Sequence, residues 1–236
     1  MEPHRIVSRA EWIEERVKLL AREKAFTEQR DQLNGLRREL PWVRVEKQYV
    51  FDAPEGKVSL ADLFDGRSQL FIKHFMMGPG QVTQCVGCSF EVDHVAGLLA
   101  HLQNHDLSYV VVARAPIDEI EAVRARMGWR FRWVSSYGSD FNYDFGVSID
   151  AAVRPPAYNY RTRAEYEALG QPFGDEPFER PGHSCFLRVD DRVFHTYSHY
   201  ARGTESVGGS YYFLDLTALG RQEDWEEPKD RVDLAS

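Results

Sequence analysis

The sequence predicts an α/β fold with a central mixed sheet flanked by helices. Three apolar runs with the length of buried strands lie at residues 68–77, 108–116 and 131–136. Two stretches with helical spacing, 89–105 and 116–128, separate them. An alternation of strand, helix, strand, helix and strand implies right-handed crossovers and parallel pairing of the three strands.

Each of these core segments carries its own signal. The run SQLFIKHFMM is broken mainly by Lys73 and His74, which is typical of a strand covered on both faces. The second helix is expected to begin at Pro116 and to end at Gly128. In the first helix, apolar residues recur at i, i+3, i+4 and i+7, namely Val95, Leu98, Leu99 and Leu102.

The N-terminal residues 8–40 read as a helical arm. Ser8 followed by Glu11 has the spacing of a capping box, and Asn34-Gly35 predicts a break in the helix. The charges of the arm are mixed in sign, which favours packing on the domain or on a second subunit over binding nucleic acid. We therefore expect a helical extension, residues 1–40, before a domain that spans 41–236.

The remaining segments complete the sheet. Residues 42–51 alternate as a half-buried strand does, and 185–198 read as a hairpin that turns at Asp190-Asp191. Between the core and this hairpin, residues 137–182 are rich in Gly, Pro, Tyr and Asp and form a loop-rich insertion. The run 210–224 is expected to close the fold with a strand-like piece and a helix.

Composition limits the partners. The 236 residues include 37 acidic and 29 basic side chains, a net charge of −8, which argues against nucleic acid and anionic membranes as partners. No apolar run approaches the ~20 residues of a membrane helix, and the N-terminus lacks the apolar stretch of a secretory signal. Three cysteines are too few for a disulfide-stapled secreted fold, so we expect a cytoplasmic protein.

Two of the cysteines, Cys85 and Cys88, form a C-x-x-C between a predicted strand and a predicted helix. The free N–H groups of a helix's first turn carry partial positive charge, and they favour a thiolate over a thiol. Because the thiolate is the reactive form, this position activates a redox cysteine. We predict that Cys85, at the helix tip, attacks, and that Cys88, which points inward, resolves the mixed disulfide. Cys185 is expected to be a small core residue.

A metal site on the same thiols is the structural alternative. Helical geometry would place His94, His101 and His105 on one stripe, and two thiolates with imidazoles suit zinc. The sequence offers no second C-x-x-C, so no metal ligand is predicted. His195 and His199 lie in hairpin and loop sequence, where single histidines are more often structural.

The order of strand, C-x-x-C, helix, strand, helix, strand, hairpin and C-terminal helix resembles the thioredoxin fold. Residues 44–75 are similar to the start of peroxiredoxin-like and thiol-peroxidase-like proteins. The chain more closely resembles a bacterial family of thioredoxin-like proteins of unknown function, predicted to be dithiol-disulfide oxidoreductases. The segments that carry this resemblance are LPWVRVEKQYVF, CVGCSF, MGWRFRWVSSYGSDFNYDF, VFHTYSHYARG and YYFLDLTALGRQED.

Departures from these relatives affect the site. Val86-Gly87 replaces the Gly-Pro pair of thioredoxins, so their redox potential does not carry over. Thioredoxins place a cis-proline ahead of the hairpin, whereas here either His183 or Ser184 could face the cysteines. Peroxiredoxins carry Pro-x-x-x-Thr-x-x-Cys, whereas in this chain the spacing from Thr83 to Cys85, after Pro79, is one residue too short. The resemblance and the position of the loop imply substrate contacts at Gly78, Pro79, Thr83 and His183.

These observations predict a thiol-disulfide oxidoreductase that needs no bound organic cofactor. Its partners would be a disulfide-containing substrate and an external thiol reductant, and the N-terminal helix makes a homodimer plausible. One alternative is a thiol peroxidase, in which peroxide oxidises Cys85 and Cys88 resolves the sulfenic acid. Another is a non-enzymatic binding protein of the same fold, with metal on its thiols.

Overall fold

The computed structural model describes residues 4–81, 83–174 and 176–219. The chain divides into two units, 1–41 and 42–236, and the first consists mainly of helix α1 (Arg9–Glu39). The predicted capping box is confirmed: Ser8 Oγ accepts from the Glu11 N–H, and the Glu11 carboxylate accepts from the Ser8 N–H at 2.9 Å. The predicted break at Asn34-Gly35 is wrong, because one glycine costs a helix only about 1 kcal/mol.

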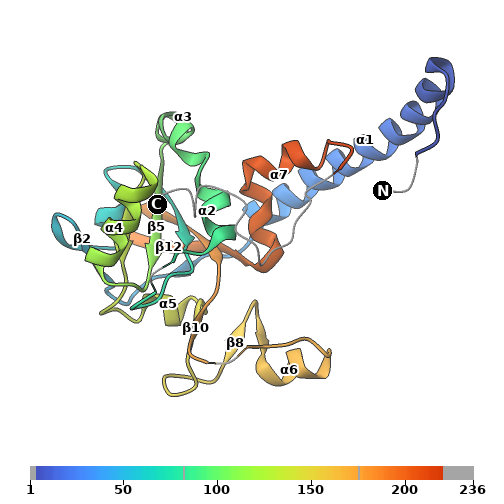
Figure 1. Cartoon of the computed structure of the whole chain (residues 1–236). Coiled ribbons are helices and arrows are strands. Elements are labelled where there is room, and N and C mark those ends of the chain that lie inside the picture. Colours follow the sequence, from blue (N-terminus) through green and yellow to red (C-terminus); the bar gives the residue numbers. More distant parts are fainter. Residues whose placement is uncertain (1–3, 82, 175, 220–236) are drawn as a thin grey trace. The chain divides into compact units, whose positions relative to one another are not determined.

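The second unit is built on one mixed sheet, as expected (Figure 1). The strand order is β1-β12-β11-β4-β5-β6-β2-β3, in which the pairs β4·β5 and β5·β6 are parallel and the others are antiparallel. The strands are β1 (Val43–Arg44), β2 (Val50–Ala53), β3 (Gly56–Ser59), β4 (Gln69–His74), β5 (Leu107–Ala113), β6 (Arg132–Ser135), β11 (Gly182–Val189) and β12 (Arg192–Tyr200).

The arrangement β12-β11-β4-β5, with the hairpin β11–β12 antiparallel to the parallel pair, is the core of the thioredoxin-like fold. This confirms the fold that the sequence predicted, including the turn at Asp190-Asp191. The α-helices of this unit are α2 (Val86–Val92), α3 (Leu99–Asn104), α4 (Ile117–Met127), α5 (Phe141–Asp144), α6 (Arg163–Ala168) and α7 (Gly209–Leu214). Short 3₁₀ turns are η1 (Asp62–Phe64), η2 (Val95–Gly97) and η3 (Ala201–Val207).

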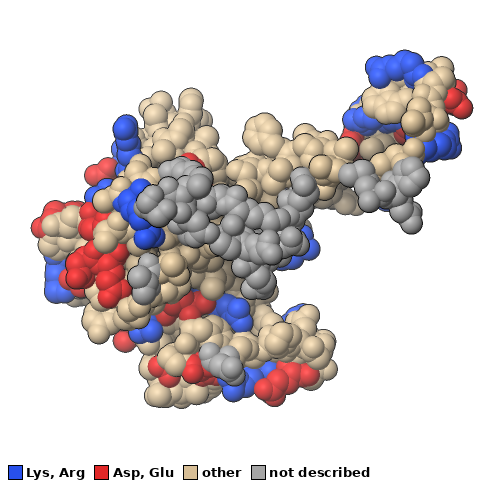
Figure 2. All heavy atoms as spheres, in the orientation of Figure 1, with Lys and Arg blue, Asp and Glu red and all other residues tan. Residues whose placement is uncertain are grey.

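The two faces of the sheet are covered by different elements. Buried residues of α2 and α4, among them Val92 and Ile120, pack with Val111 and Trp133 on one face. On the other face, η1 and α5 pack with Leu70, Ile72, Val110 and Val112. The buried thiol Cys88 of the site described below belongs to the layer between the sheet and α2. Figure 2 shows acidic and basic side chains interspersed on the visible surface.

Three predicted elements differ in the structure. Residues 42–51 form two strands rather than one, because β1 pairs with β12 and β2 pairs with β3 and β6, toward opposite edges of the sheet. The continuous helix expected over 89–105 is divided into α2, η2 and α3. The strand-like piece expected in 210–224 is instead helix α7 over 209–214, and residues 220–224 lie outside the described residues.

A tertiary hydrogen bond lies at the break after α2. The indole Nε1 of Trp129 donates to Asp93 Oδ1 at 2.7 Å, which ties the C-cap of α2 to the segment after α4. Helical spacing in the sequence cannot reveal such a bond, because the two residues are 36 positions apart.

The insertion 137–182 contains two small sheets, β7 (Ser148–Ile149) with β10 (Phe178–Glu179) and β8 (Ala157–Tyr158) with β9 (Arg161–Thr162). It has a small core of its own, which Tyr200 of β12 joins: Val147, Ile149, Tyr158, Phe173 and Tyr200. Among the described helices, none combines the length and the apolar character that crossing a membrane requires.

Candidate active site

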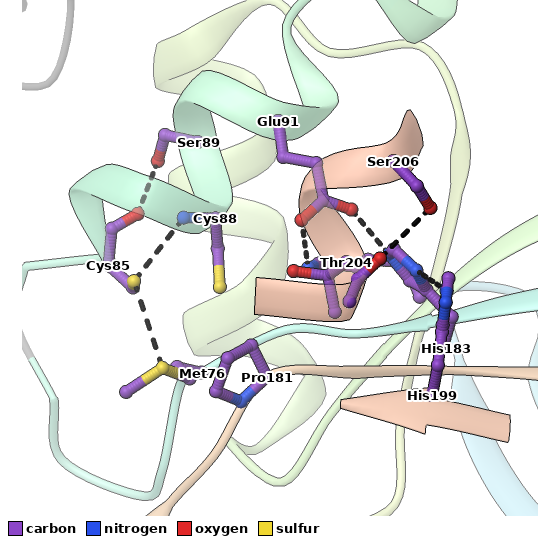
Figure 3. Close-up of polar contacts among 12 residues, drawn as sticks. Met76, Cys85, Cys88, Ser89, Glu91, Pro181, His183, His199, Thr204 and Ser206 are labelled. Atoms are coloured by element: carbon purple, nitrogen blue, oxygen red, sulfur yellow. Dashed lines mark hydrogen bonds and ion pairs between the residues drawn. The ribbon is translucent and has the colours of Figure 1, made fainter. Parts of the chain in front are cut away.

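Cys85 is the N-cap of α2 and follows the loop that leaves β4 (Figure 3). Its extended backbone (φ −63°, ψ 123°) turns Sγ back over the first turn, where it accepts from the Cys88 N–H at 3.3 Å. The Ser89 N–H and Oγ both donate to the Cys85 carbonyl at 2.9 Å and fasten this turn. A helix start supplies unpaired N–H donors, so the position favours negative charge on the sulfur.

The two thiols differ in accessibility in the order that the sequence predicted. Cys85 is partly exposed, whereas Cys88 is 3% exposed and belongs to the core between α2 and the sheet. Both are free cysteines in the structure. The outer sulfur can therefore meet a substrate, and the inner one can reach only its neighbour.

The two thiols also differ in acidity. The hydrogen bond from the Cys88 thiol, with the Cys88 and Gly87 N–H groups and the charge of Lys73, outweighs burial and lowers the pKa of Cys85 to about 6. The same thiol hydrogen bond and burial raise the pKa of Cys88 well above its ordinary value. At neutral pH, Cys85 is a thiolate and Cys88 a thiol.

A buried ion pair lies beside the thiols. Lys73 of β4 is 0% exposed, and its Nζ lies 2.5 Å from Glu91 Oε2 on α2. Burial lowers the pKa of Lys73, but attraction to the neighbouring thiol pair and to the Glu91 carboxylate outweighs burial, so the pKa is raised and Lys73 stays a cation. Burial raises the pKa of Glu91, but Lys73 and His183 outweigh it and set the pKa at about 2.

Sequence reasoning missed this pair as part of the site. Its two signals were a lysine within an apolar strand run and a glutamate three residues after Cys88, on the same face of the helix as that thiol. Neither signal names a partner, because Lys73 and Glu91 are 18 positions apart and meet only when α2 folds onto the sheet.

Two histidines extend the pair across the hairpin. His183 of β11 is 1% exposed, and its Nε2 lies 2.5 Å from Glu91 Oε1. Its Nδ1 lies 2.6 Å from Nε2 of His199 on β12, which is partly exposed. His183, which we expected at the substrate lip, is thus placed in the buried layer and hydrogen-bonded on both nitrogens.

The other three residues expected to contact substrate lie in the loop between β4 and α2. Pro79 and Thr83 are exposed, and the Gly78 N–H donates to Gln81 Oε1 at 3.0 Å. In the same loop, Met76 Sδ lies 3.9 Å from Cys85 Sγ. Pro79 and Thr83 are therefore accessible in the loop that precedes Cys85, and Gly78 is partly exposed there.

The insertion supports this loop through Glu179 of β10. Its buried carboxylate accepts from Arg114 Nε and from Ser148 Oγ, each at 2.6 Å. A Cβ on Gly78 would lie 3.6 Å from Glu179 Cγ, so the thiol loop passes close over this group. The insertion thus contacts the loop that carries Gly78.

The structure also answers two further expectations and shows one departure from thioredoxins. The stripe of His94, His101 and His105 on one helix is wrong, since His94 caps η2, His101 lies inside α3 and His105 is the C-cap of α3. Cys185 lies in β11 opposite Phe71 of β4, is partly exposed, and burial raises its pKa to about 11. The peptide bond before Pro181, the proline ahead of the hairpin, is not cis, in contrast to thioredoxins.

Solved structures with similar folds are proteins described as peroxiredoxins. A bacterioferritin comigratory protein of Xanthomonas campestris has a TM-score of 0.45 and 12% identity, over 68% of this chain and 88% of its own. Peroxidoxin BcpB of Mycobacterium tuberculosis has a TM-score of 0.45 and 12% identity, over 72% and 95%. A mutant PrxQ of Xylella fastidiosa has a TM-score of 0.42 and 12% identity, over 70% and 88%.

No curated protein matches the chain. A model of one family, described as "Bacterial protein of unknown function (DUF899)", matches residues 1–233. That match spans the helical arm, the thiol loop, the insertion and the hairpin, and it confirms the resemblance to a bacterial family of unknown function. The chain therefore belongs to the bacterial family DUF899.

Proposed function

We propose that the protein is a thiol-disulfide oxidoreductase that works through Cys85 and Cys88. The observation that carries the proposal is the polarised pair: a partly exposed sulfur with a pKa of about 6 accepts hydrogen bonds from a buried thiol and its backbone N–H. A thiolate is the attacking species in disulfide exchange, and a second thiol within one helical turn can resolve the product.

The reaction begins when the Cys85 thiolate attacks one sulfur of a substrate disulfide. A bond forms between Cys85 Sγ and that sulfur, and the other substrate sulfur leaves as a thiolate that takes up a proton. Cys88 then loses its proton and attacks Cys85 Sγ, which expels the second substrate sulfur. The substrate gains two electrons and becomes two thiols, and Cys85 and Cys88 become a disulfide.

An external dithiol returns the protein to its starting state by the reverse exchange. It attacks Cys85, the accessible sulfur, and Cys88 leaves. No organic cofactor takes part, and the reducing cytoplasm is the compartment that would supply the dithiol. In this scheme Gly78, Pro79 and Thr83 form the surface on which the substrate disulfide rests.

The test is single-turnover reduction of a model disulfide such as insulin, followed by regeneration with dithiothreitol. We expect Cys85→Ser to abolish the reaction, Cys88→Ser to accumulate a mixed disulfide on Cys85 that mass spectrometry detects, and the matched control Cys185→Ser to react normally. Equal rates for Cys85→Ser and the parent chain would refute the proposal.

A parallel assay with a peroxide in place of insulin distinguishes a thiol peroxidase from a disulfide reductase. A peroxide would oxidise Cys85 to a sulfenic acid with release of an alcohol or water, and Cys88 would convert it to the disulfide with release of water. Fast consumption of peroxide with slow reduction of insulin would replace the proposed substrate class and keep both cysteine roles. If the parent chain shows neither activity, the result favours a non-enzymatic binding protein.

A further inference from the structure

A chain of four polar side chains runs through the layer between the sheet and α2. It joins Lys73 Nζ to Glu91 Oε2 at 2.5 Å, Glu91 Oε1 to His183 Nε2 at 2.5 Å, and His183 Nδ1 to His199 Nε2 at 2.6 Å. The four residues come from β4, α2, β11 and β12. Figure 3 shows the part from Glu91 through His183 to His199 beside the turn that carries the cysteines.

This series of hydrogen-bonded side chains leads from the interior toward the surface. Lys73, His183 and Glu91 are 0%, 1% and 6% exposed, whereas His199 at the other end is partly exposed. Cys88 lies beside the inner end, one helical turn before Glu91 on α2. Consecutive hydrogen bonds therefore join an accessible imidazole to the Lys73–Glu91 pair next to the buried thiol.

The protonation states determine in which direction the hydrogen bonds from His199 to Glu91 are donated. The Glu91 carboxylate accepts on both oxygens, so His183 donates from Nε2. Burial lowers the pKa of His183, which keeps the ring neutral, and its Nδ1 is then an acceptor. The hydrogen between His183 Nδ1 and His199 Nε2 therefore belongs to His199, and every donor from His199 to Glu91 points inward.

The proposed redox cycle needs a proton at the inner end. When an external thiolate attacks Cys85 of the disulfide, the electron pair of the broken bond remains on Cys88. This sulfur is 3% exposed and its pKa is raised well above the ordinary value, so it ends the step as a thiol. The proton must reach a place that bulk water does not.

We propose that His183 and His199 are the proton path to Cys88 and its neighbours Lys73 and Glu91, an inference that rests on the proposed function. As His199 takes a proton from solvent on Nδ1, its Nε2 proton passes to His183 Nδ1, and the His183 Nε2 proton passes to Glu91. Glu91 then gives this proton to the Cys88 thiolate one helical turn away, so that Cys88 ends as a thiol and Glu91 is again a carboxylate. After this passage the donors point outward, which suits the reverse step when Cys88 is deprotonated.

Several charged or titratable groups face the path. Lys73 of β4 is directly opposite His183 in register, and Glu91 faces it from α2. Tyr109 of β5 is partly buried, and desolvation followed by the charge of Glu91 raises its pKa well above the ordinary value. The Tyr197 ring lies 5.3 Å from the His199 ring on β12. Of the groups in the path, His199 is the one that is partly exposed, so it is the residue to change.

The test compares His199→Ala with His195→Ala in stopped-flow reduction of the Cys85–Cys88 disulfide by dithiothreitol. His195 is a matched control, because it is also a partly exposed histidine of β12 but bonds Ser198 at 2.7 Å instead of the path. We expect His199→Ala to slow the step about tenfold or more, since a positioned proton donor contributes at least that much. Added imidazole should restore the rate for His199→Ala and leave His195→Ala unchanged.

A second variant separates proton transfer from packing. His199→Gln can still donate a hydrogen bond to His183 but cannot relay a proton, so we expect it to be as slow as His199→Ala. A normal rate in His199→Gln, or no effect of imidazole on His199→Ala, would overturn the path. Attack of Cys85 on a substrate disulfide in a Cys88→Ser background needs no such proton, so its failure would refute the proposed function itself.

Discussion

Cys85 and Cys88 share one turn of backbone and acquire opposite properties from it. Cys85 precedes the first helical turn and receives hydrogen bonds, whereas Cys88 lies within that turn and supplies them. The largest single influence on the Cys85 pKa is the hydrogen bond from the Cys88 thiol, ahead of burial and of the Lys73 charge. The reactivity of the outer sulfur thus depends on the protonation of the inner one.

This dependence predicts different results for two substitutions of Cys88. Cys88→Ala removes the side-chain donor, so we expect the pKa of Cys85 to rise from about 6 toward the ~8.5 of a free cysteine. Cys88→Ser keeps a hydroxyl donor and should hold the pKa low. The ultraviolet absorbance of the thiolate against pH measures both. The same midpoint in the two variants would show that the backbone N–H groups and Lys73 suffice.

At the scale of elements, the hairpin β11–β12 positions His183 against α2. Gly182 begins β11, and a Cβ there would lie 2.6 Å from Tyr200 Cδ1 and 3.2 Å from Val147 Cγ1. The Tyr200 ring cannot move aside easily, because it is 8% exposed and its hydroxyl donates to the Phe145 carbonyl at 2.9 Å. The absence of a side chain at position 182 allows the strand to lie next to this ring.

Gly182→Ala should therefore destabilise the protein by overpacking, by about 1–3 kcal/mol. The matched control is Gly97→Ala, where an added Cβ meets nothing within 4 Å, and its effect should stay within about 0.5 kcal/mol. Urea unfolding followed by tryptophan fluorescence measures both. Equal stability of the two variants would mean that the Tyr200 ring adjusts without cost.

Element boundaries show where local patterns stop being informative. The alternation of residues 42–51 is real, but a period of two does not say which edge of the sheet a strand joins, and β1 and β2 join opposite sides. The helical spacing of 89–105 is also real, yet the bond from Trp129 to Asp93 accompanies the end of α2. In both cases the structure brings in a partner distant in sequence, which the local pattern does not reveal.

For the whole molecule, the buried charges link stability to pH. Glu91 has a pKa of about 2 in the folded protein against 4.5 as its ordinary value. Since its folded-state pKa is depressed, its contribution to stability is fully present above pH 4.5 and is lost as the pH falls toward 2. The pKa of His183 is also lowered, so the folded protein keeps this ring neutral while the unfolded chain protonates it below pH 6.5. His183 therefore also makes the free energy of unfolding fall as the pH falls below 6.5.

We therefore expect the free energy of unfolding to fall by about 3 kcal/mol between pH 4.5 and 2 through Glu91. Glu91→Gln should remove this dependence and should cost about 3–5 kcal/mol at pH 7, because Lys73 is left unpaired in the interior. Glu167→Gln, at an exposed position of α6, is the control and should keep the parent profile. Parallel pH profiles for Glu91→Gln and the parent chain would contradict the assignment.

The sequence by itself determined the order of the core strands β4, β5 and β6 and the helices between them, the capping box of α1 and the place of Cys85 and Cys88 between β4 and α2. These follow from spacing within short segments, where residue type and local backbone geometry suffice. Only the tertiary structure decided that Lys73, Glu91, His183 and His199 meet. They come from four elements, and the links from Glu91 to Lys73 and to His183 span 18 and 92 positions. A buried charge is stable only beside its partner, and only the packing of α2 and the hairpin on the sheet brings those partners together.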